Sequence, residues 1–258
     1  MNRTSRWPLL IFLFLLAACG SGTPAGSVAA LSPTPTPTPG ITPTPTIPTV
    51  AARLVHFMTS DHVRLAGLLY GRGKTAIICS HELFTTKAIW RDSGMPQRLA
   101  QLGYLALAYD FRGYGDSLGV SDLSVLDVDL RAAVGFARQQ GATKIVLMGS
   151  SMGGSASLKV AATEPVTALI TLSAPQQWSP FPLSDSDVQA ISAPKLFVNS
   201  EYDDYADQTT HMYTIATEPK QLRMYPGVAH GTAIFGTENG ASLIQLLLNF
   251  IARYAPAS

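Results

Sequence analysis

The 258-residue chain contains little charge and almost no cysteine. Charged residues make up 14% of it and the formal net charge is +1, so the chain lacks the basic surface that binds nucleic acid. Its two cysteines, Cys19 and Cys79, are too few for a disulfide framework and match no paired spacing of zinc ligands. We therefore expect no nucleic-acid partner, no metal and no other cofactor.

The chain also lacks an apolar run long enough to cross a membrane as a helix. The apolar stretch near the N-terminus, residues 9–18, is shorter than the ~20 residues that a spanning helix needs. It follows Arg3 and Arg6, as the apolar region of an export signal does. This pattern favours a cleaved signal over the alternative, a signal-anchor that stays in the bilayer.

The end of this stretch carries a recognisable cleavage pattern. The sequence Leu16-Ala17-Ala18-Cys19 resembles the lipobox of bacterial lipoproteins. The resemblance implies removal of residues 1–18 and acylation of Cys19 on its sulfur and its amino group. Several acyl chains give a stable membrane attachment where a single chain is marginal. We therefore expect an exported protein, anchored in the membrane through Cys19 on the extracytoplasmic face.

Residues 19–50 differ in composition from the rest of the chain. Proline, threonine, glycine, serine and alanine dominate, and Thr-Pro alternates over residues 33–39 and again over 42–48. Such a segment cannot bury enough apolar surface to fold, and alternating proline favours an extended polyproline II conformation. We interpret it as a disordered stalk between the anchor and a folded domain. A docking motif for a proline-binding module is the alternative.

From residue 51 to residue 258, short β-rich runs alternate with helical ones, which indicates one α/β domain with a mainly parallel sheet. Residues 54–59 and 63–70 are predicted to form an antiparallel hairpin. Cys79 is expected to be a small buried residue in a strand. Helices are predicted over residues 123–140, 155–162 and 243–254, and the six further predicted strands are residues 75–80, 104–109, 144–148, 166–172, 195–199 and 221–225.

The pentapeptide Gly149-Ser150-Ser151-Met152-Gly153 lies between a predicted strand and a predicted helix. A G-x-S-x-G sequence in this position is typical of a nucleophile elbow, a tight turn that exposes the serine oxygen to substrate. A serine hydroxyl is a weak nucleophile unless a neighbouring base activates it. Ser151 is therefore the candidate nucleophile, and a base and an acid should be found elsewhere in the chain.

With its strands in this order, the segment 51–255 resembles the α/β-hydrolase family, in particular its lidless esterases similar to dienelactone hydrolase. Residues 110–117, Asp-Phe-Arg-Gly-Tyr-Gly-Asp-Ser, look like the structural turn that follows the fourth strand in many members. The resemblance implies an eight-stranded, mostly parallel sheet with an N-terminal antiparallel hairpin and helices on both faces. Only residues 173–194 separate the sixth and seventh predicted strands, which leaves no room for a lid domain.

The family's order of nucleophile, acid and histidine leaves His211 and His230 as the candidate bases. His230 follows the last predicted strand in a Pro-Gly-x-x-His-Gly loop that resembles the family's histidine loop, so it is the predicted general base. His211 is expected on a helix in solvent. The turn 200–204 resembles the family's G-x-x-D turn, and the resemblance places Asp203 as the acid that orients the histidine.

Two alternatives remain open around this acid. Asp204 is expected to be a solvated capping residue, and it is the alternative acid. Asp203, Asp204, Asp207 and His211 could in principle hold a metal ion, although no other residue completes such a site.

Two backbone amides should stabilise the oxyanion of an acyl-transfer reaction. The elbow supplies the amide of Met152, and the resemblance assigns the second to Leu83. Glu82 stands where the family commonly has glycine, so either its carboxylate points away from the site or the activity is weak. His81 is expected to brace the loop through hydrogen bonds.

A serine nucleophile favours acyl transfer, so esters, thioesters and small amides are all admissible substrates. An open site could be bordered by Phe84, Trp178 and Phe181, which are otherwise ordinary packing aromatics. We predict a monomeric serine hydrolase that cleaves a carboxylic ester in a small-molecule acyl substrate. The alternatives are a peptidase or thioesterase with the same triad, and a catalytically silent surface-binding domain.

Overall fold

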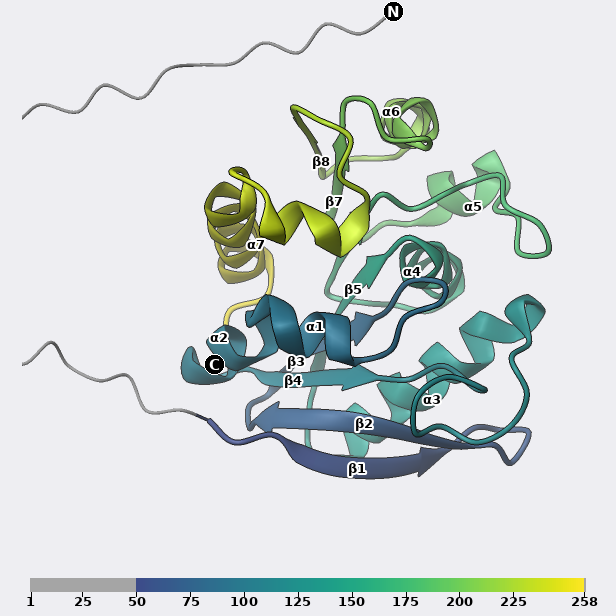
Figure 1. The fold of residues 1–258 in the computed structure, drawn as a ribbon, viewed down its shortest axis with the longest axis vertical. Coiled ribbons are helices and arrows are strands. Elements are labelled where there is room, and N and C mark those ends of the chain that lie inside the picture. Colours follow the sequence, from purple (N-terminus) through teal and green to yellow (C-terminus); the bar gives the residue numbers. More distant parts are fainter. Residues whose placement is uncertain (1–49, 258) are drawn as a thin grey trace, which may run out of the picture. The chain divides into compact units, whose positions relative to one another are not determined.

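The computed structural model of the chain describes residues 50–257 (Figure 1). The predictions for residues 1–49, namely the export signal, the anchor at Cys19 and the stalk, lie outside the described residues. Within them, eight strands form one sheet in the order β1-β2-β4-β3-β5-β6-β7-β8. The strands are β1 Arg53–Met58, β2 Arg64–Gly71, β3 Thr75–Ser80, β4 Leu105–Tyr109, β5 Lys144–Ser150, β6 Ala168–Leu172, β7 Lys195–Ser200 and β8 Lys220–Tyr225.

The pairing of the strands agrees with the predicted mixture of directions. β1 and β2 form an antiparallel hairpin, and β2 pairs antiparallel with β4. All other neighbouring strands in the sheet run parallel. The predicted strand ends lie within two residues of the observed ones. The apolar runs locate these strands well because β3 to β7 are buried on both faces, which requires nearly continuous hydrophobic sequence.

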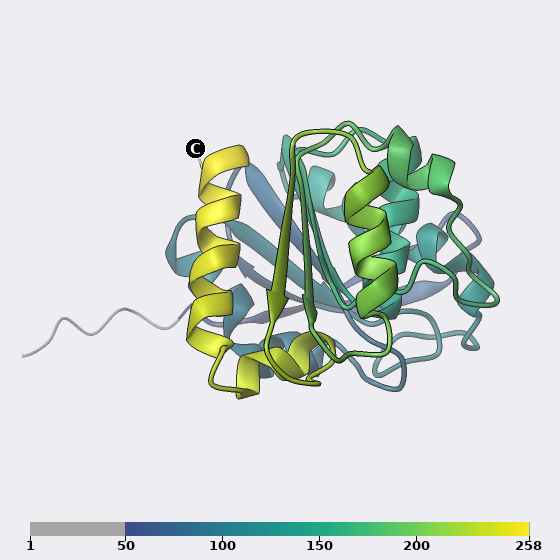
Figure 2. The same ribbon diagram turned by 90° about the horizontal axis from the view of Figure 1, so that it is seen from above.

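Two hydrophobic cores lie on the two faces of the sheet. Alternate residues of β3 show the division, since Ala76 and Ile78 join one core and Ile77 and Cys79 join the other. Figure 2 shows the yellow α7 on one side of the strands and the green α6 on the other. The first core packs under α3 Leu126–Gln139, α4 Met152–Thr163, α5 Asp185–Ala190 and α6 Ala206–Ile215, and the second under α1 Ala88–Ser93, α2 Met95–Gln101 and α7 Gly240–Tyr254.

The three predicted helices are present with shifted ends. The helix predicted over 123–140 is divided into a short 3-10 turn, η1 Leu123–Val125, and α3. The helix predicted from residue 155 begins at Met152, because the turn after β5 leads directly into it and tertiary packing overrides the low helix propensity of two glycines. No helix within residues 50–257 is long and apolar enough to cross a membrane.

The turn at residues 110–117 is anchored by ion pairs, as the sequence predicts for a structural turn. The fully buried Asp110 pairs with Lys87, which also reaches Asp116 at 2.7 Å. Arg112 contacts the fully buried Asp129 at 2.7 Å and Asp61 at 2.7 Å. These pairs fasten the turn to α3 and to the segments around it, and they leave Arg112 and Asp116 with structural roles.

The loops that carry the candidate site all leave the same edge of the sheet. β3, β5, β6, β7 and β8 run parallel to one another, so their carboxyl ends meet there. Ligands of open α/β sheets bind at this edge. The loops after these strands carry, in chain order, Glu82 and Leu83, Ser151, Ser173, Asp203, and His230.

Candidate active site

Ser151 is the single residue between β5 and α4. Its backbone has φ 48° and ψ −120°, a conformation that costs free energy for any residue other than glycine. The surrounding structure holds it there: the Ser151 N–H donates to the Leu172 carbonyl at 2.8 Å, and its own carbonyl accepts from the N–H of Ser155 at 3.0 Å. The turn is therefore the sharp strand-to-helix elbow that the sequence predicts.

The close approach of backbone at the elbow explains the glycine that ends the pentapeptide. A Cβ atom at Gly153 would lie 2.4 Å from the Ser80 carbonyl oxygen, so any side chain there would push α4 away from β3. Ser151 itself is 8% exposed. The elbow thus presents one hydroxyl at the sheet edge while its backbone is packed against the neighbouring strand.

His230 and Asp203 are joined by a direct hydrogen bond. Nδ1 of His230 lies 2.6 Å from Oδ2 of Asp203, whose side chain is almost fully buried. Because Nδ1–H donates to the carboxylate, Nε2 is left as the acceptor nitrogen of the neutral ring. The Ser151 hydroxyl and His230 share no hydrogen bond in the structure. Catalytic hydrogen bonds are often long before substrate binds, so this separation is compatible with proton transfer in a substrate complex.

The pKa values of this pair move apart. The hydrogen bond and charge of Asp203 raise the pKa of His230. Burial alone would raise the pKa of Asp203, but hydrogen bonds from His230 and from the backbone N–H of Tyr205 lower it. The result is an anionic carboxylate beside an imidazole whose protonated form it stabilises, as a general base requires.

A chain of hydrogen bonds between uncharged groups ends on the Asp203 carboxylate and supports the pair. Gly231 N–H donates to Oγ of Ser173 at 2.9 Å, and Ser173 donates to Oδ1 of Asn199 at 2.5 Å. The Asn199 amide then donates to Oδ1 of Asp203 at 3.2 Å. Ser173 and Asn199 are fully buried, and this chain links the loops after β6, β7 and β8. The sequence did not lead us to Ser173 or Asn199, although a polar side chain at the carboxyl end of an apolar strand can indicate a residue of the site.

Ser200 occupies the glycine position of the acid turn and adds another link. Its hydroxyl donates to the carbonyl of Ala229 at 2.6 Å, so the acid loop is bonded directly to the loop that carries His230. The serine at this position therefore preserves the approach of the two loops.

Comparisons with known proteins agree with this architecture. Residues 86–186 match a family model described as serine aminopeptidase, S33. Two relatives, the uncharacterized proteins MT2364 and Rv2307c of Mycobacterium tuberculosis strains, are each 27% identical over 222 residues, covering 73% of this chain and 76% of the relative.

Solved structures share the whole described architecture. The esterase Pf2001 of Pyrococcus furiosus matches with a TM-score of 0.69 and 17% identity, over 80% of this chain and 93% of the esterase. The α/β hydrolase GrgF of Penicillium sp. sh18 matches with a TM-score of 0.69 and 20% identity, over 80% of this chain and 99% of GrgF. This chain has the α/β-hydrolase fold. An esterase domain from a Rhodothermus marinus protein, with a TM-score of 0.63 and 21% identity over 79% of this chain and 99% of the domain, has it too.

In this α/β-hydrolase fold, the loop after β3 faces the elbow. Within residues 50–257, neither the N–H of Leu83 nor that of Met152 donates a hydrogen bond to protein. The carboxylate of Glu82, the residue before Leu83, is hydrogen-bonded to other residues of the site. Its Oε1 accepts hydrogen bonds from Ser150 and from Thr232, so the carboxylate is directed toward the histidine loop.

His81 braces the same loop, as the sequence predicts. The side chain is fully buried, with Nδ1 2.7 Å from the Glu82 carbonyl and Nε2 accepting from the N–H of Phe111 at 3.0 Å. Burial lowers the pKa of His81 to about 4. The ring is therefore neutral near pH 7 and holds its position through one donated and one accepted hydrogen bond.

The side chains of Asp204 and His211, the alternative residues, form no hydrogen bond to Asp203 or His230. Asp204 is exposed. The expectation that it caps the next helix is wrong, because α6 follows Tyr205 and has no side-chain cap. The N–H of Tyr205 donates to Oδ1 of Asp203 at 2.9 Å. His211 lies on α6 and pairs with the exposed Asp185 at 3.0 Å. Within residues 50–257, no group of three or more ligating side chains could hold a metal ion.

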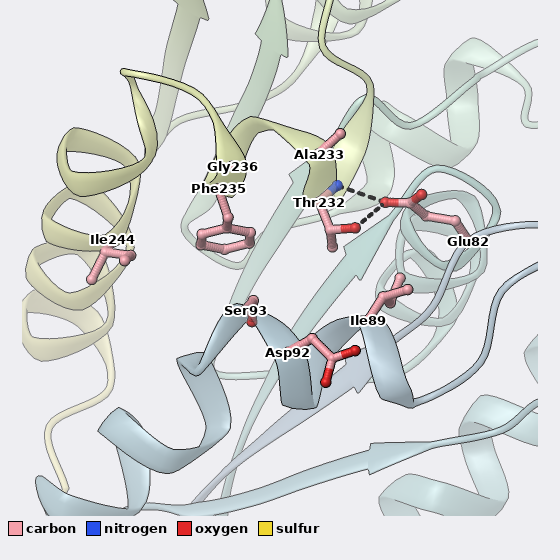
Figure 3. Close-up of a pocket in the computed structure, with 9 residues that line it drawn as sticks. All are labelled: Glu82, Ile89, Asp92, Ser93, Thr232, Ala233, Phe235, Gly236 and Ile244. Carbon is pink, nitrogen blue, oxygen red and sulfur yellow. Dashed lines mark hydrogen bonds between the residues drawn. The ribbon is translucent and has the colours of Figure 1, made fainter.

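Two pockets adjoin the site. One of about 450 Å³ opens beside His230, and its lining is Tyr202, Asp203, Asp204, Tyr205, Val228 and His230. A second of about 430 Å³ lies between α1, η2 Gly231–Gly236 and α7, and Figure 3 shows its lining, Glu82, Ile89, Asp92, Ser93, Thr232, Ala233, Phe235, Gly236 and Ile244.

The aromatic residues expected at the border of the site divide into two kinds. Trp178 and Phe181 pack into the hydrophobic core under the α3–α6 layer, so they are packing residues. Phe84 is 89% exposed beside the Leu83 loop and lies free to contact a substrate.

Proposed function

We propose that this protein is a serine hydrolase that cleaves a carboxylic ester bond. One observation carries the proposal: Ser151 is held at a strained elbow, on the sheet edge where His230 is hydrogen-bonded at 2.6 Å to the buried Asp203. The match to a hydrolase family model and the shared fold of known esterases support the same reaction class.

The proposed reaction has two acyl-transfer steps. Oγ of Ser151 attacks the ester carbonyl while Nε2 of His230 accepts its proton, and Asp203 stabilises the imidazolium. The N–H groups of Met152 and Leu83 donate to the oxyanion. When the intermediate collapses, the C–O bond to the alcohol breaks and His230 returns its proton to the leaving oxygen. Water, deprotonated by His230, then hydrolyses the acyl-serine and regenerates the free hydroxyl.

The pocket beside His230 suits the leaving group of such a substrate. His230, which must deliver a proton to the departing alcohol, is one of its lining residues, and Tyr202 and Val228 in the same lining expose 74% and 73% of their surface. Because the segment between β6 and β7 contains only the short helix α5, we propose an open site without a lid. Small esters are the expected substrates.

A serine-reactive fluorophosphonate and a short-chain p-nitrophenyl ester test this function. We expect stoichiometric labelling and hydrolysis by the wild-type fragment 50–258, and loss of both in Ser151→Ala. Labelling that persists in Ser151→Ala would show that another nucleophile reacts. A folded wild-type fragment that is neither labelled nor active would favour the catalytically silent binding domain.

A peptidase is the second candidate, because the matching family model is described as a serine aminopeptidase. The same triad can cleave amides when the leaving amine is protonated by His230. Comparing kcat/KM for a p-nitrophenyl ester with that for aminoacyl p-nitroanilides separates the two. Preference for the anilides would identify a peptidase, and thioesters in the same series test the thioesterase alternative.

We further propose that the protein is exported and held on the membrane by lipid at Cys19. The lipobox-like sequence before this residue supports the anchor. Expression of the full chain in a bacterium, with metabolic labelling by an alkyne fatty acid, should give a labelled membrane-bound protein. Cys19→Ala should lose the label. A wild-type chain that takes up no label contradicts the anchor without touching the hydrolase assignment.

A further inference from the structure

Glu82 joins three loops of the site through one oxygen atom. Its Oε1 accepts hydrogen bonds from Oγ of Ser150 at 2.6 Å, from the N–H of Thr232 at 2.6 Å and from Oγ1 of Thr232 at 2.7 Å. Figure 3 shows the two bonds to Thr232, which run from the loop after β3 to the first turn of η2. Hydrogen bonds to a carboxylate are shorter and stronger than bonds between neutral groups.

Each bonded residue is next to a residue of the proposed machinery. Ser150 precedes the nucleophile Ser151, Thr232 is two residues after His230, and Glu82 itself precedes Leu83. We propose that Glu82 is a positioning residue that holds the His230 loop and the Leu83 amide in register with the nucleophile elbow. This inference rests on the proposed function, because it assigns a role to a residue of the same site.

The backbone of the histidine loop is shaped to admit this carboxylate. Gly231 has φ 55°, and a Cβ atom there would lie 2.3 Å from Oε1 of Glu82 and 2.3 Å from Oγ of Ser150. Only glycine allows both the left-handed conformation and the close approach of the two side chains. The glycine that follows the histidine is thus explained by the Glu82 contact.

The Glu82 contact and the Ser173–Asn199 chain hold His230 from two sides. The Ser173–Asn199 chain joins Gly231 to Asp203 and therefore fixes the ring relative to the acid. Glu82 joins Thr232 to Ser150 and therefore fixes the same loop relative to the nucleophile. Ser151 and His230 share no hydrogen bond before substrate binds, and Glu82 is the side chain that bonds both the residue before Ser151 and the loop of His230.

The charge of Glu82 also acts on His230. The carboxylates that face this ring are Asp203, Asp204 and Glu82, and each raises the pKa of His230, with Asp203 contributing most. Replacing Glu82 by glutamine keeps a hydrogen-bond acceptor at the same place but removes the charge. Glu82→Gln should therefore move the acidic limb of the rate profile to lower pH, by about half a pH unit or less.

Steady-state kinetics on a p-nitrophenyl ester test the role, with the active fraction of each variant measured by fluorophosphonate labelling. We expect Glu82→Ala to lower kcat by about 10- to 100-fold with a smaller change in KM, because the loop carrying the base loses its register. Glu82→Gln should keep most of kcat and show the shifted acidic limb. Glu238→Gln, a neutralised exposed carboxylate after η2, is the matched control and should resemble wild type.

The outcomes separate this inference from the proposed function. If wild type hydrolyses the ester through Ser151 while Glu82→Ala keeps wild-type kcat and pH profile, Glu82 has no positioning role. If Glu82→Ala does not fold, two other measurements test the role. They are kcat of Thr232→Val, which removes one of the three bonds to Glu82, and the pH–rate profile of Glu82→Gln. A wild-type kcat in Thr232→Val together with an unshifted acidic limb in Glu82→Gln overturns the inference.

Discussion

The turns after β4 and β5 leave the same edge of the sheet, on either side of β3, but are held by different forces. The turn 110–117 after β4 is anchored by the buried ion pairs Lys87–Asp110 and Arg112–Asp129. The same two cations also contact the exposed carboxylates of Asp116 and Asp61. The elbow 149–153 after β5 contains no charged residue. Its strained Ser151 is held by backbone hydrogen bonds and by the single carboxylate of Glu82 on Ser150.

The difference follows from what each turn does. Buried ion pairs hold a loop rigidly when every charge is matched, and the turn 110–117 has only to keep its shape. Acyl transfer develops negative charge on the carbonyl oxygen beside the nucleophile, so a carboxylate aimed at that oxygen would oppose the transition state. The elbow therefore relies mainly on backbone hydrogen bonds, and the carboxylates of Asp203 and Glu82 bond His230 and Ser150 rather than Ser151.

The largest effect is expected when the negative charge of Asp203, the acid bonded to His230, is removed. Asp203→Asn keeps the shape of the acid but no longer stabilises the imidazolium, so kcat/KM for a p-nitrophenyl ester should fall by about 10³- to 10⁴-fold. Initial rates, with melting curves to verify folding, measure it. Asp204→Asn is the comparison variant and should show a much smaller loss. A greater loss in Asp204→Asn would make Asp204 the acid.

Removing an ion pair of the turn 110–117 should lower the stability of the protein and leave catalysis unchanged. Asp129→Ala leaves the buried guanidinium of Arg112 with Asp61 alone and should lower the free energy of unfolding by about 3 kcal/mol, measured by urea denaturation. Asp127→Asn, which disrupts a partly exposed pair with Arg131 on the same helix, should cost about 0.5 kcal/mol or less. If Asp129→Ala lowers kcat of the labelled, folded protein, the two turns are coupled and the comparison fails.

A buried lysine that forms no ion pair within residues 50–257 sharpens the contrast with Arg112. Lys195 is fully buried and its Nζ donates to the carbonyl of Thr217 at 2.7 Å; burial lowers its pKa to about 8. Hydrogen bonds to Asp61 and Asp129 instead raise the pKa of Arg112. Charged Lys195 therefore opposes folding, whereas Arg112 is stabilised by its partners.

The sign of the pH effect follows from this lowered pKa. Between pH 8 and the ordinary lysine value of 10.5, the unfolded chain binds a proton at Lys195 that the native state has released, so stability rises with pH. Relative to Lys195→Met, wild type should gain about 1–3 kcal/mol across this interval. Chemical denaturation at several pH values measures the difference. A difference that stays constant with pH would contradict the assignment.

The smallest expected effect concerns the pH profile at the elbow. Asp203 raises the pKa of His230 above its ordinary value of 6.5, and the base must be neutral to act. The acidic limb of kcat/KM should therefore lie above pH 6.5 and move to lower pH in Asp203→Asn. Rates measured from about pH 5 to about pH 9 check this. A wild-type limb below 6.5 would mean that a group other than His230 limits the rate.

Much of the architecture could be read from local sequence. The continuous apolar runs located the strands, and the glycine-flanked Ser151 located the elbow, because close backbone contact needs residues without side chains. The end of β5 was predicted two residues too early, at residue 148. The strand continues through Ser150 because that residue pairs with Leu172 of β6. A strand end decided by a partner far along the chain leaves no local pattern.

The surroundings of the site could not be read in this way. Glu82 suggested either a carboxylate turned away from the site or a weak activity, and local sequence did not show that this carboxylate bonds Ser150 and Thr232. The cap expected from Asp204 is absent, since α6 has no side-chain cap, and Asp203 instead bonds both His230 and the N–H of Tyr205, the residue before the helix. Both outcomes depend on loops that meet only when the sheet is assembled.

The sequence by itself determined the order of the strands along the chain, the apolar faces that cover the sheet and the glycines that permit its tight turns. Each of these depends on neighbours within a few residues, through periodicity and backbone sterics. Only the tertiary structure decided which polar groups bond one another at the sheet edge. Serine, asparagine, threonine and glutamate accept many partners, and the packing of distant loops selects one of them.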